Sequence, residues 1–144
     1  MLCSKGSQDK LEKINERALR LAYSDYLSSY EDLLLKSKET TIHVQSIKVL
    51  ALEVYKTLNG LNPPFMQDYF LPKITGHNLR VKNALAIPKV KTTTYGIKSH
   101  IFQGPKIWNA LPDAIKMAHN IKNFKDLIKT WFLENKCSCT FCSR

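Results

Sequence analysis

The strongest constraint on the fold is a long helical pattern over residues 41–58. Apolar side chains recur there every three or four positions, which predicts one amphipathic helix. Thr40 or Thr41 can cap its first turn, and Gly60 supplies the left-handed residue with which helices often end. The residues on the expected core face are Ile47, Leu50, Ala51, Val54 and Leu58.

Two shorter helices are predicted before this one. Asp9 and Glu12 have the spacing of a capping box, and they precede an amphipathic pattern over residues 10–22. The second helix is predicted to begin after the serines at 28 and 29, because acidic residues follow at the capping distance. The expected apolar face of the first helix is Leu11, Ile14, Ala18 and Leu21.

The C-terminal half combines helices with a segment of different composition. Residues 78–103 are rich in β-branched and aromatic side chains, which predicts a small β-hairpin or sheet. Helical patterns resume at Gly104, and a last helix is predicted over residues 121–134. The expected fold is therefore mainly α with a small β insertion (α+β), arranged like a helical bundle.

The length fits one domain, since 144 residues can bury one sizeable core. We expect a disordered N-terminus over residues 1–9 and a single helical domain over residues 10–134. Residues 135–144 are expected to form a flexible tail rich in cysteine. Nothing in the sequence marks it as secreted or membrane-spanning, so we expect an intracellular protein that binds no membrane.

Charge is the most unusual property of the sequence. Lysine and arginine number 22 against 12 aspartate and glutamate, which gives a net charge of +10. Residues 1–68 are balanced, with nine of each sign, whereas residues 69–112 hold seven basic side chains and no acidic one. Such a one-signed run indicates a surface that faces a polyanion, with RNA or DNA the expected partner.

Lysines in this run alternate with hydroxyl side chains that can also donate to phosphate oxygens. Tyr95 or Phe102 could stack on an unpaired base. The alternative is a solvated strand whose lysines protect a sheet edge from aggregation. The side chains expected to contact nucleic acid, including a lysine stripe on the last helix, are Lys73, Arg80, Lys82, Lys89, Lys91, Tyr95, Lys98, Lys106, Lys122, Lys125 and Lys129.

Catalytic motifs are not evident, so we expect no enzyme activity and no small-molecule substrate. Glu31 and Asp32 are the only adjacent carboxylates, and helix capping explains them better than acid–base chemistry. No cofactor is expected, apart from a possible zinc ion at the C-terminal C-x-C-x-x-C cluster. Its ligands would be Cys137, Cys139 and Cys142, with Cys3 as a fourth if the termini meet; a reactive tail without metal is the alternative.

Seven pieces of the sequence together resemble one family. In order they are KLEKINERALRLAYSDY (10–26), SYEDLL (29–34), ALEVYKTLNGLNPP (51–64), NLR (78–80), TTYGIKS (93–99), WNALP (108–112) and NFKDLIK (123–129). They are similar to the C-terminal region of reverse transcriptases from non-LTR (LINE-type, jockey-like) retrotransposons. The resemblance covers residues 10–132 and implies a parent protein that copies RNA into DNA.

What the resemblance implies for this chain is the non-catalytic tail of such a polymerase. The aspartate box that holds two metal ions in the parent is missing, because Tyr30-Glu31-Asp32-Leu33 does not match it. The rest of the polymerase is then an expected partner if the chain belongs to a longer protein. The positions that match the family pattern, most of them expected to determine the fold, are Arg80, Tyr95, Gly96, Ser99, Trp108, Asn109, Pro112 and Phe124.

Two other functions remain open from the sequence. One is a host module that binds another protein through its exposed helices. The other is a small structural domain that depends on zinc.

Overall fold

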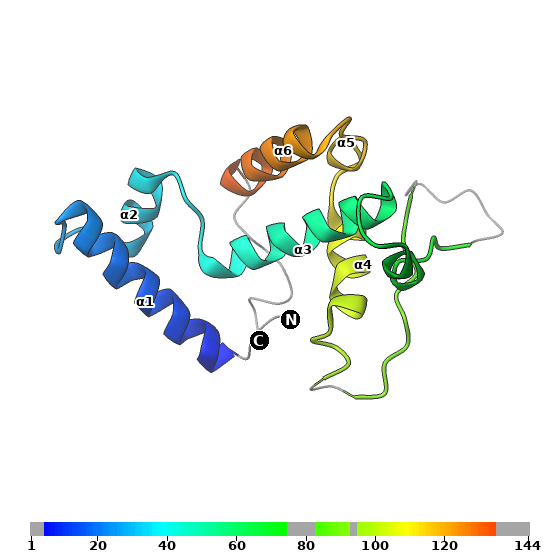
Figure 1. Ribbon diagram of the computed structural model, residues 1–144. Coiled ribbons are helices and arrows are strands. Elements are labelled where there is room, and N and C mark those ends of the chain that lie inside the picture. Colours follow the sequence, from blue (N-terminus) through cyan, green and yellow to red (C-terminus); the bar gives the residue numbers. More distant parts are fainter. Residues whose placement is uncertain (1–4, 75–82, 93–94, 135–144) are drawn as a thin grey trace. The chain divides into compact units, whose positions relative to one another are not determined.

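The computed structural model describes residues 5–74, 83–92 and 95–134. Helices dominate these residues, so the predicted mainly α class is confirmed (Figure 1). No described helix is long and apolar enough to cross a membrane. In chain order the elements are α1 (Lys5–Tyr23), α2 (Tyr30–Ser37), α3 (Ile42–Leu58), the 3-10 helix η1 (Pro64–Tyr69), α4 (His100–Ala110), α5 (Asp113–Lys116) and α6 (Ile121–Glu134).

The chain divides into two compact units, although we expected one helical domain over residues 10–134. Unit 1 contains Ile47–Trp131, and therefore most of α3, η1, α4, α5 and most of α6. Unit 2 contains the described residues up to Ser46, together with residues 132–134 at the end of α6. The single domain expected over residues 10–134 stays a prediction.

In unit 2, α1 and α2 are joined by polar contacts. Ser29 caps α2 in the predicted capping box, because its side chain accepts from the Asp32 N–H and the Asp32 carboxylate accepts from the Ser29 N–H. The Tyr30 hydroxyl donates to Glu12 Oε2 over 2.6 Å. Glu12 Oε1 also accepts the N–H of His43 over 3.0 Å, so one α1 carboxylate satisfies an unpaired donor at the start of α3.

The start of α1 differs from the prediction. The helix begins at Lys5, so residues 5–9, which we expected to be disordered, are helical, and Asp9 is inside the helix rather than at its cap. The apolar stripe predicted to face a core is exposed, with Ile14 62% and Leu21 67% accessible. Periodicity established the stripe correctly, but it gives no information on what the stripe contacts.

Three helices end in the same way, with a left-handed residue after the last turn. After α3, Gly60 has φ of 68°, its N–H donates to Thr57 O, and the next N–H donates to Lys56 O. This is a Schellman motif, as predicted for Gly60. Ser24 and Lys38 occupy the equivalent positions after α1 and α2 with φ of 48° and 55°. Residues with a Cβ are strained in this conformation.

The core of unit 1 is built around Phe124 of α6, which is fully buried. Its ring stacks on Tyr55 of α3, with centroids 4.4 Å apart, and on Trp108 of α4, with centroids 6.4 Å apart. The Tyr55 hydroxyl donates to Ala118 O over 2.8 Å, so its buried polar end is satisfied. Burial of a side chain such as Phe124 contributes about 1.5–3 kcal/mol to folding, which makes this stack a main source of stability.

The predicted β insertion is not confirmed. Among the described residues of 78–103, the one β pairing is made by Leu85, which forms an isolated antiparallel bridge with Pro72. Residues 95–98 form a turn and His100 begins α4, so the last part of the predicted β segment is not a strand. The physical reason is local: Ser99 accepts the N–H of Phe102 and caps a helix there, and this outweighs β propensity.

Candidate nucleic-acid interface

Residues 73–106 contain the first group of predicted contacts and are called the basic strip. The first part of this strip is held on α4 by side chains of that helix. The Asn109 amide accepts the N–H of Leu85 over 2.8 Å and donates to Leu85 O over 2.9 Å. Trp108 Nε1 donates to Asn83 O over 3.1 Å. Beside these bonds, the N–H of Lys73 donates to Ala84 O over 2.8 Å. Hydrogen bonds therefore fix the backbone of Lys73 and of residues 83–85, the segment that leads to Lys89.

A compact turn positions the next two predicted contacts, Tyr95 and Lys98. Its centre is Gly96, whose N–H donates to Thr92 Oγ1 over 2.9 Å. A Cβ at this glycine would lie 2.7 Å from Thr92 O and 2.8 Å from Val90 Cβ, so a larger residue would displace the turn. The turn leads into a helix and not into the predicted β segment.

The buried Gln103 of α4 forms a hydrogen bond with the same turn. Its Nε2 donates to the carbonyl oxygen of Ile97, the residue before Lys98. Its Oε1 is buried and has no hydrogen-bond partner among the described residues. Gln103 was not singled out from the sequence, because a glutamine within a helix start carries no sign of burial.

Most predicted contact residues in this strip are accessible. Lys73, Lys89 and Lys91 are exposed, Lys98 is half-buried, and Tyr95 is 73% accessible. Among the described residues, none of these four lysines forms an ion pair with a carboxylate. Their charges are therefore available to an external anion.

Lys106 and Phe102, two other residues of the strip, contact each other. Lys106 is half-buried, and its Nζ lies 5.9 Å from the centroid of the Phe102 ring. This cation–π contact covers one face of Phe102, which is itself half-buried. Phe102 is consequently less suited than Tyr95 to stack on an unpaired base.

The second predicted group is the lysine stripe on α6. Lys122, Lys125 and Lys129 are exposed, on the side of the helix away from the buried Phe124 and Ile128. Asp126 is also exposed. It lies four residues after Lys122 and three residues before Lys129, which makes these side chains neighbours on the helix surface. This carboxylate reduces the net charge of the stripe, and it forms no ion pair with the stripe lysines in the described structure.

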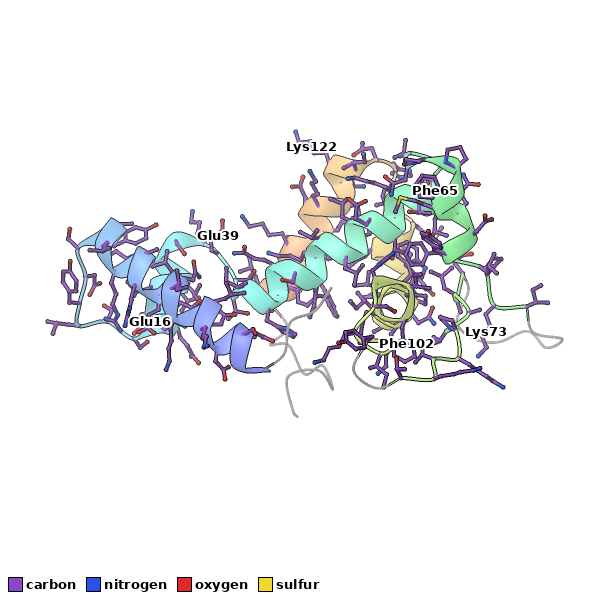
Figure 2. The ribbon with its side chains drawn as sticks, turned by 60° about the horizontal axis from the view of Figure 1, so that its bottom comes forward. Glu16, Glu39, Phe65, Lys73, Phe102 and Lys122 are labelled. Atoms are coloured by element: carbon purple, nitrogen blue, oxygen red, sulfur yellow. The ribbon has the colours of Figure 1, made fainter. Side chains whose placement is uncertain are left out.

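One lysine from each of the two basic groups can be located in Figure 2. In Figure 2, Lys73 and Phe102 are seen on one side of α3, whereas Lys122 is seen on the other. The labelled lysines of the two groups, Lys73 and Lys122, therefore do not lie side by side in this view.

Acidic side chains in unit 1 are few, and two of the four are neutralised locally. Lys56 Nζ lies 2.7 Å from Glu53 Oε1, and this hydrogen bond lowers the pKa of Glu53. Asp113 lies 3.3 Å from the Nζ of Lys116, whose side chain is only 2% accessible. The burial of Lys116 was not predicted, since a lysine in a short helix ordinarily points to solvent. The other two acids, Asp68 and Asp126, form no ion pair with the strip lysines in the described structure.

An aromatic group next to the strip was also missed by the sequence analysis. The Tyr69 ring contacts Phe65 with centroids 6.4 Å apart and His100 with centroids 5.8 Å apart, both edge to face. Phe65 and Tyr69 belong to η1, and Phe65 is 62% exposed. The core residue of this turn is Phe70, which is 3% exposed.

The remaining predicted site residues lie outside the described structure. They are Arg80, Lys82 and the zinc candidates Cys137, Cys139 and Cys142. Within the described ranges, no group of three or more histidine, cysteine, aspartate and glutamate side chains could hold a metal ion.

Comparisons with known proteins supply no relative: no family model, no curated protein and no solved structure matches the chain.

Proposed function

We propose that this chain is the non-catalytic C-terminal part of a non-LTR retrotransposon reverse transcriptase and that it binds RNA or DNA without sequence preference. The observation that carries the binding proposal is the set of exposed strip lysines that have no carboxylate partner in the described structure. The polymerase part of the proposal rests on the seven family-like sequence pieces alone.

Electrostatics supports a polyanionic ligand. Residues 47–131 carry thirteen basic and four acidic side chains, a net charge of +9, and two of these acids already pair within the unit. Each phosphate that a lysine neutralises releases condensed counterions, so affinity is expected to fall steeply with salt. Contacts to phosphates alone do not read bases, which is why the binding is proposed to be sequence-independent.

In this proposal the chain contributes no polymerase chemistry. Phosphoryl transfer by two metal ions needs carboxylates that converge on one site. Of the adjacent acids Glu31 and Asp32, the Asp32 carboxylate is held by Ser29 in the capping box of α2. The proposed contribution of the chain is to hold a nucleic acid on which the rest of the polymerase acts.

A salt series tests the binding proposal. Dissociation constants for single-stranded RNA and duplex DNA would be measured between about 50 and 200 mM salt, the range over which phosphate contacts weaken strongly. Replacing Lys89, Lys91 and Lys98 with glutamate should weaken binding at every salt concentration and flatten the salt dependence. Unchanged affinity, or no binding by the unaltered protein at the lowest salt, contradicts the proposal.

A matched control separates this surface from overall charge. Replacing the exposed Lys10, Lys13 and Arg17 of α1 with glutamate changes the net charge by the same amount. If binding depends on the strip, this variant should keep most of its affinity. Equal losses in the two triple variants would indicate that only net charge matters.

The polymerase origin is tested separately, from the nucleotide sequence upstream of the codon for Met1. A reading frame there, intact or broken, that encodes a polymerase palm with its aspartate box would support the proposal. An unrelated upstream sequence would count against it and would leave the binding experiment unaffected.

A second candidate function, a protein-interaction module, is favoured by the exposed apolar stripe of α1. Ile14 and Leu21 are more than 60% accessible, and the exposed cations Lys10 and Arg17 border them. Such a face suits an apolar helix with acidic flanks. Replacing Ile14 and Leu21 with serine should abolish capture of a partner from nuclease-treated extract while leaving RNA affinity unchanged; capture by both proteins, or by neither, argues against this candidate.

A further inference from the structure

The contact of η1 with the start of α4 produces a row of three aromatic rings in the order Phe65, Tyr69, His100. Tyr69 is central, and both of its ring contacts are edge to face, with interplanar angles of 78° and 74°. The rings come from segments about 30 residues apart in the chain, so their proximity is a product of the fold and is not visible in the sequence.

This row is open to solvent. Phe65 is 62% exposed, Tyr69 is 36% exposed, and His100 is exposed as well. Aromatic side chains of this size are ordinarily buried or used in binding, and a cluster of them at the surface is more informative than a single exposed ring. An edge-to-face arrangement also leaves ring faces at both ends of the row that no aromatic neighbour covers.

The charged residues closest to the row along the chain are mostly positive. Lys98 precedes His100 by two residues, and Lys73 follows Tyr69 by four, and neither forms an ion pair in the described structure. The exception is Asp68, an exposed carboxylate of η1 beside Tyr69. Cations in the same segments as the aromatic row fit a ligand that is both anionic and aromatic, whereas they give an uncharged apolar peptide no advantage.

We infer that Phe65, Tyr69 and His100 form a stacking platform for unpaired nucleobases, with Lys98 and Lys73 contacting the phosphates of the same strand. The inference rests on the proposed function and narrows its substrate class to single-stranded RNA or DNA. Paired bases stack on each other and present only edges in the grooves, so a duplex cannot use the ring faces. Each base that stacks on a protein ring raises affinity by about 5- to 150-fold.

The experiment compares three ligands of equal length: a single strand, a duplex, and an abasic strand that keeps the phosphates but lacks bases. The variant is Phe65→Leu combined with Tyr69→Leu, which keeps apolar bulk and removes both rings. Its affinity for the single strand should fall at least about 5-fold, while its affinity for the duplex and the abasic strand should not change. RNA and DNA single strands are both tested to show which sugar is accepted.

Tyr26→Leu is the matched control, because Tyr26 is an equally exposed ring of unit 2 that lies outside the row. Its binding should equal that of the unaltered protein. A single strand that contains 2-aminopurine gives an independent readout, since its fluorescence is quenched when the base stacks on a ring. His100→Leu serves as a second variant with an intact η1, and far-ultraviolet circular dichroism verifies that each protein is folded.

The outcomes separate this inference from the proposed function. Loss of single-strand affinity and quenching in both row variants supports the platform. If the Lys89, Lys91 and Lys98 variant loses affinity while the row variants do not, or if abasic and ordinary strands bind equally well, the platform is overturned and the proposed function stands. If the unaltered protein binds none of the three ligands, both are overturned.

Discussion

The side-chain amide of Asn109 forms two hydrogen bonds with the main chain of Leu85, accepting its N–H over 2.8 Å and donating to its carbonyl oxygen over 2.9 Å. One helical side chain thus provides both bonds that a neighbouring strand would supply. Leu85 is 3% exposed, so without this amide its polar groups would be left without a protein partner. The role of Asn109 is therefore to hold a segment that is distant in the chain.

Replacing Asn109 with alanine should lower the free energy of unfolding by about 1–3 kcal/mol, because it leaves two part-buried backbone groups unpaired. Denaturation by urea measures this change. Asn123→Ala is the control, since the Asn123 side chain makes no hydrogen bond in the described structure, and it should change stability by no more than about 0.5 kcal/mol. Equal stability of the two variants would contradict the role assigned to Asn109.

Gly104→Ala should destabilise unit 1 through a steric conflict. A Cβ at Gly104 would lie 2.6 Å from a ring carbon of Phe70 and 3.0 Å from a methyl of Val54. Overpacking of this kind costs about 1–3 kcal/mol. Phe70→Leu in the same chain should recover part of the loss, so a double-mutant cycle should give a favourable coupling; two purely additive losses would show that the two sites do not touch.

Lys38→Gly should stabilise the protein. Lys38 has φ of 55° at the end of α2, a conformation that costs about 1 kcal/mol or more for residues with a Cβ. Glycine relieves this strain but makes the unfolded chain more flexible, so the net gain should be about 0.5–1 kcal/mol. Lys38→Ala removes the same charge while keeping the strain. A gain in that control equal to the gain in Lys38→Gly would assign the effect to charge.

Asp25 should make stability dependent on acid pH. Hydrogen bonds from the Ser28 hydroxyl and N–H lower the pKa of the Asp25 carboxyl to about 2. An aspartate in the unfolded chain has a pKa of about 3.9, so the stabilisation is complete above that pH and is lost as the pH falls toward 2. Unfolding experiments at several pH values should show Asp25→Asn less stable than the unaltered protein at pH 5, with the difference shrinking below pH 4. A difference that is constant from pH 5 to pH 2 would exclude this linkage.

Helix ends were predictable where a local sequence signal marks them. The Ser29 capping box and the Gly60 stop are encoded by a few adjacent residues, and the structure confirms both. The apolar stripe of α1 was also correct as a pattern, but its exposure was not predictable, because periodicity does not say whether a partner surface exists. The β insertion was not confirmed because β propensity depends on a neighbouring strand, and Asn109 takes the place of that neighbour.

For the candidate site, sequence alone located the charges. The absence of acids between Asp68 and Asp113 identified the strip, and the described lysines Lys73, Lys89 and Lys91 are indeed exposed. What it could not find was the row of Phe65, Tyr69 and His100, since a contact between distant segments leaves no local trace. Binding itself stays a prediction for all of these residues.

The aromatic stack of Tyr55, Phe124 and Trp108 also gives the protein a spectroscopic probe. Both tryptophans of the chain, Trp108 and Trp131, belong to unit 1. Their fluorescence therefore reports the unfolding of that unit, whereas far-ultraviolet circular dichroism also registers α1 and α2. Coincident transitions would mean that the two units unfold cooperatively as the single domain expected from the sequence, and separate transitions would assign each unit a stability of its own.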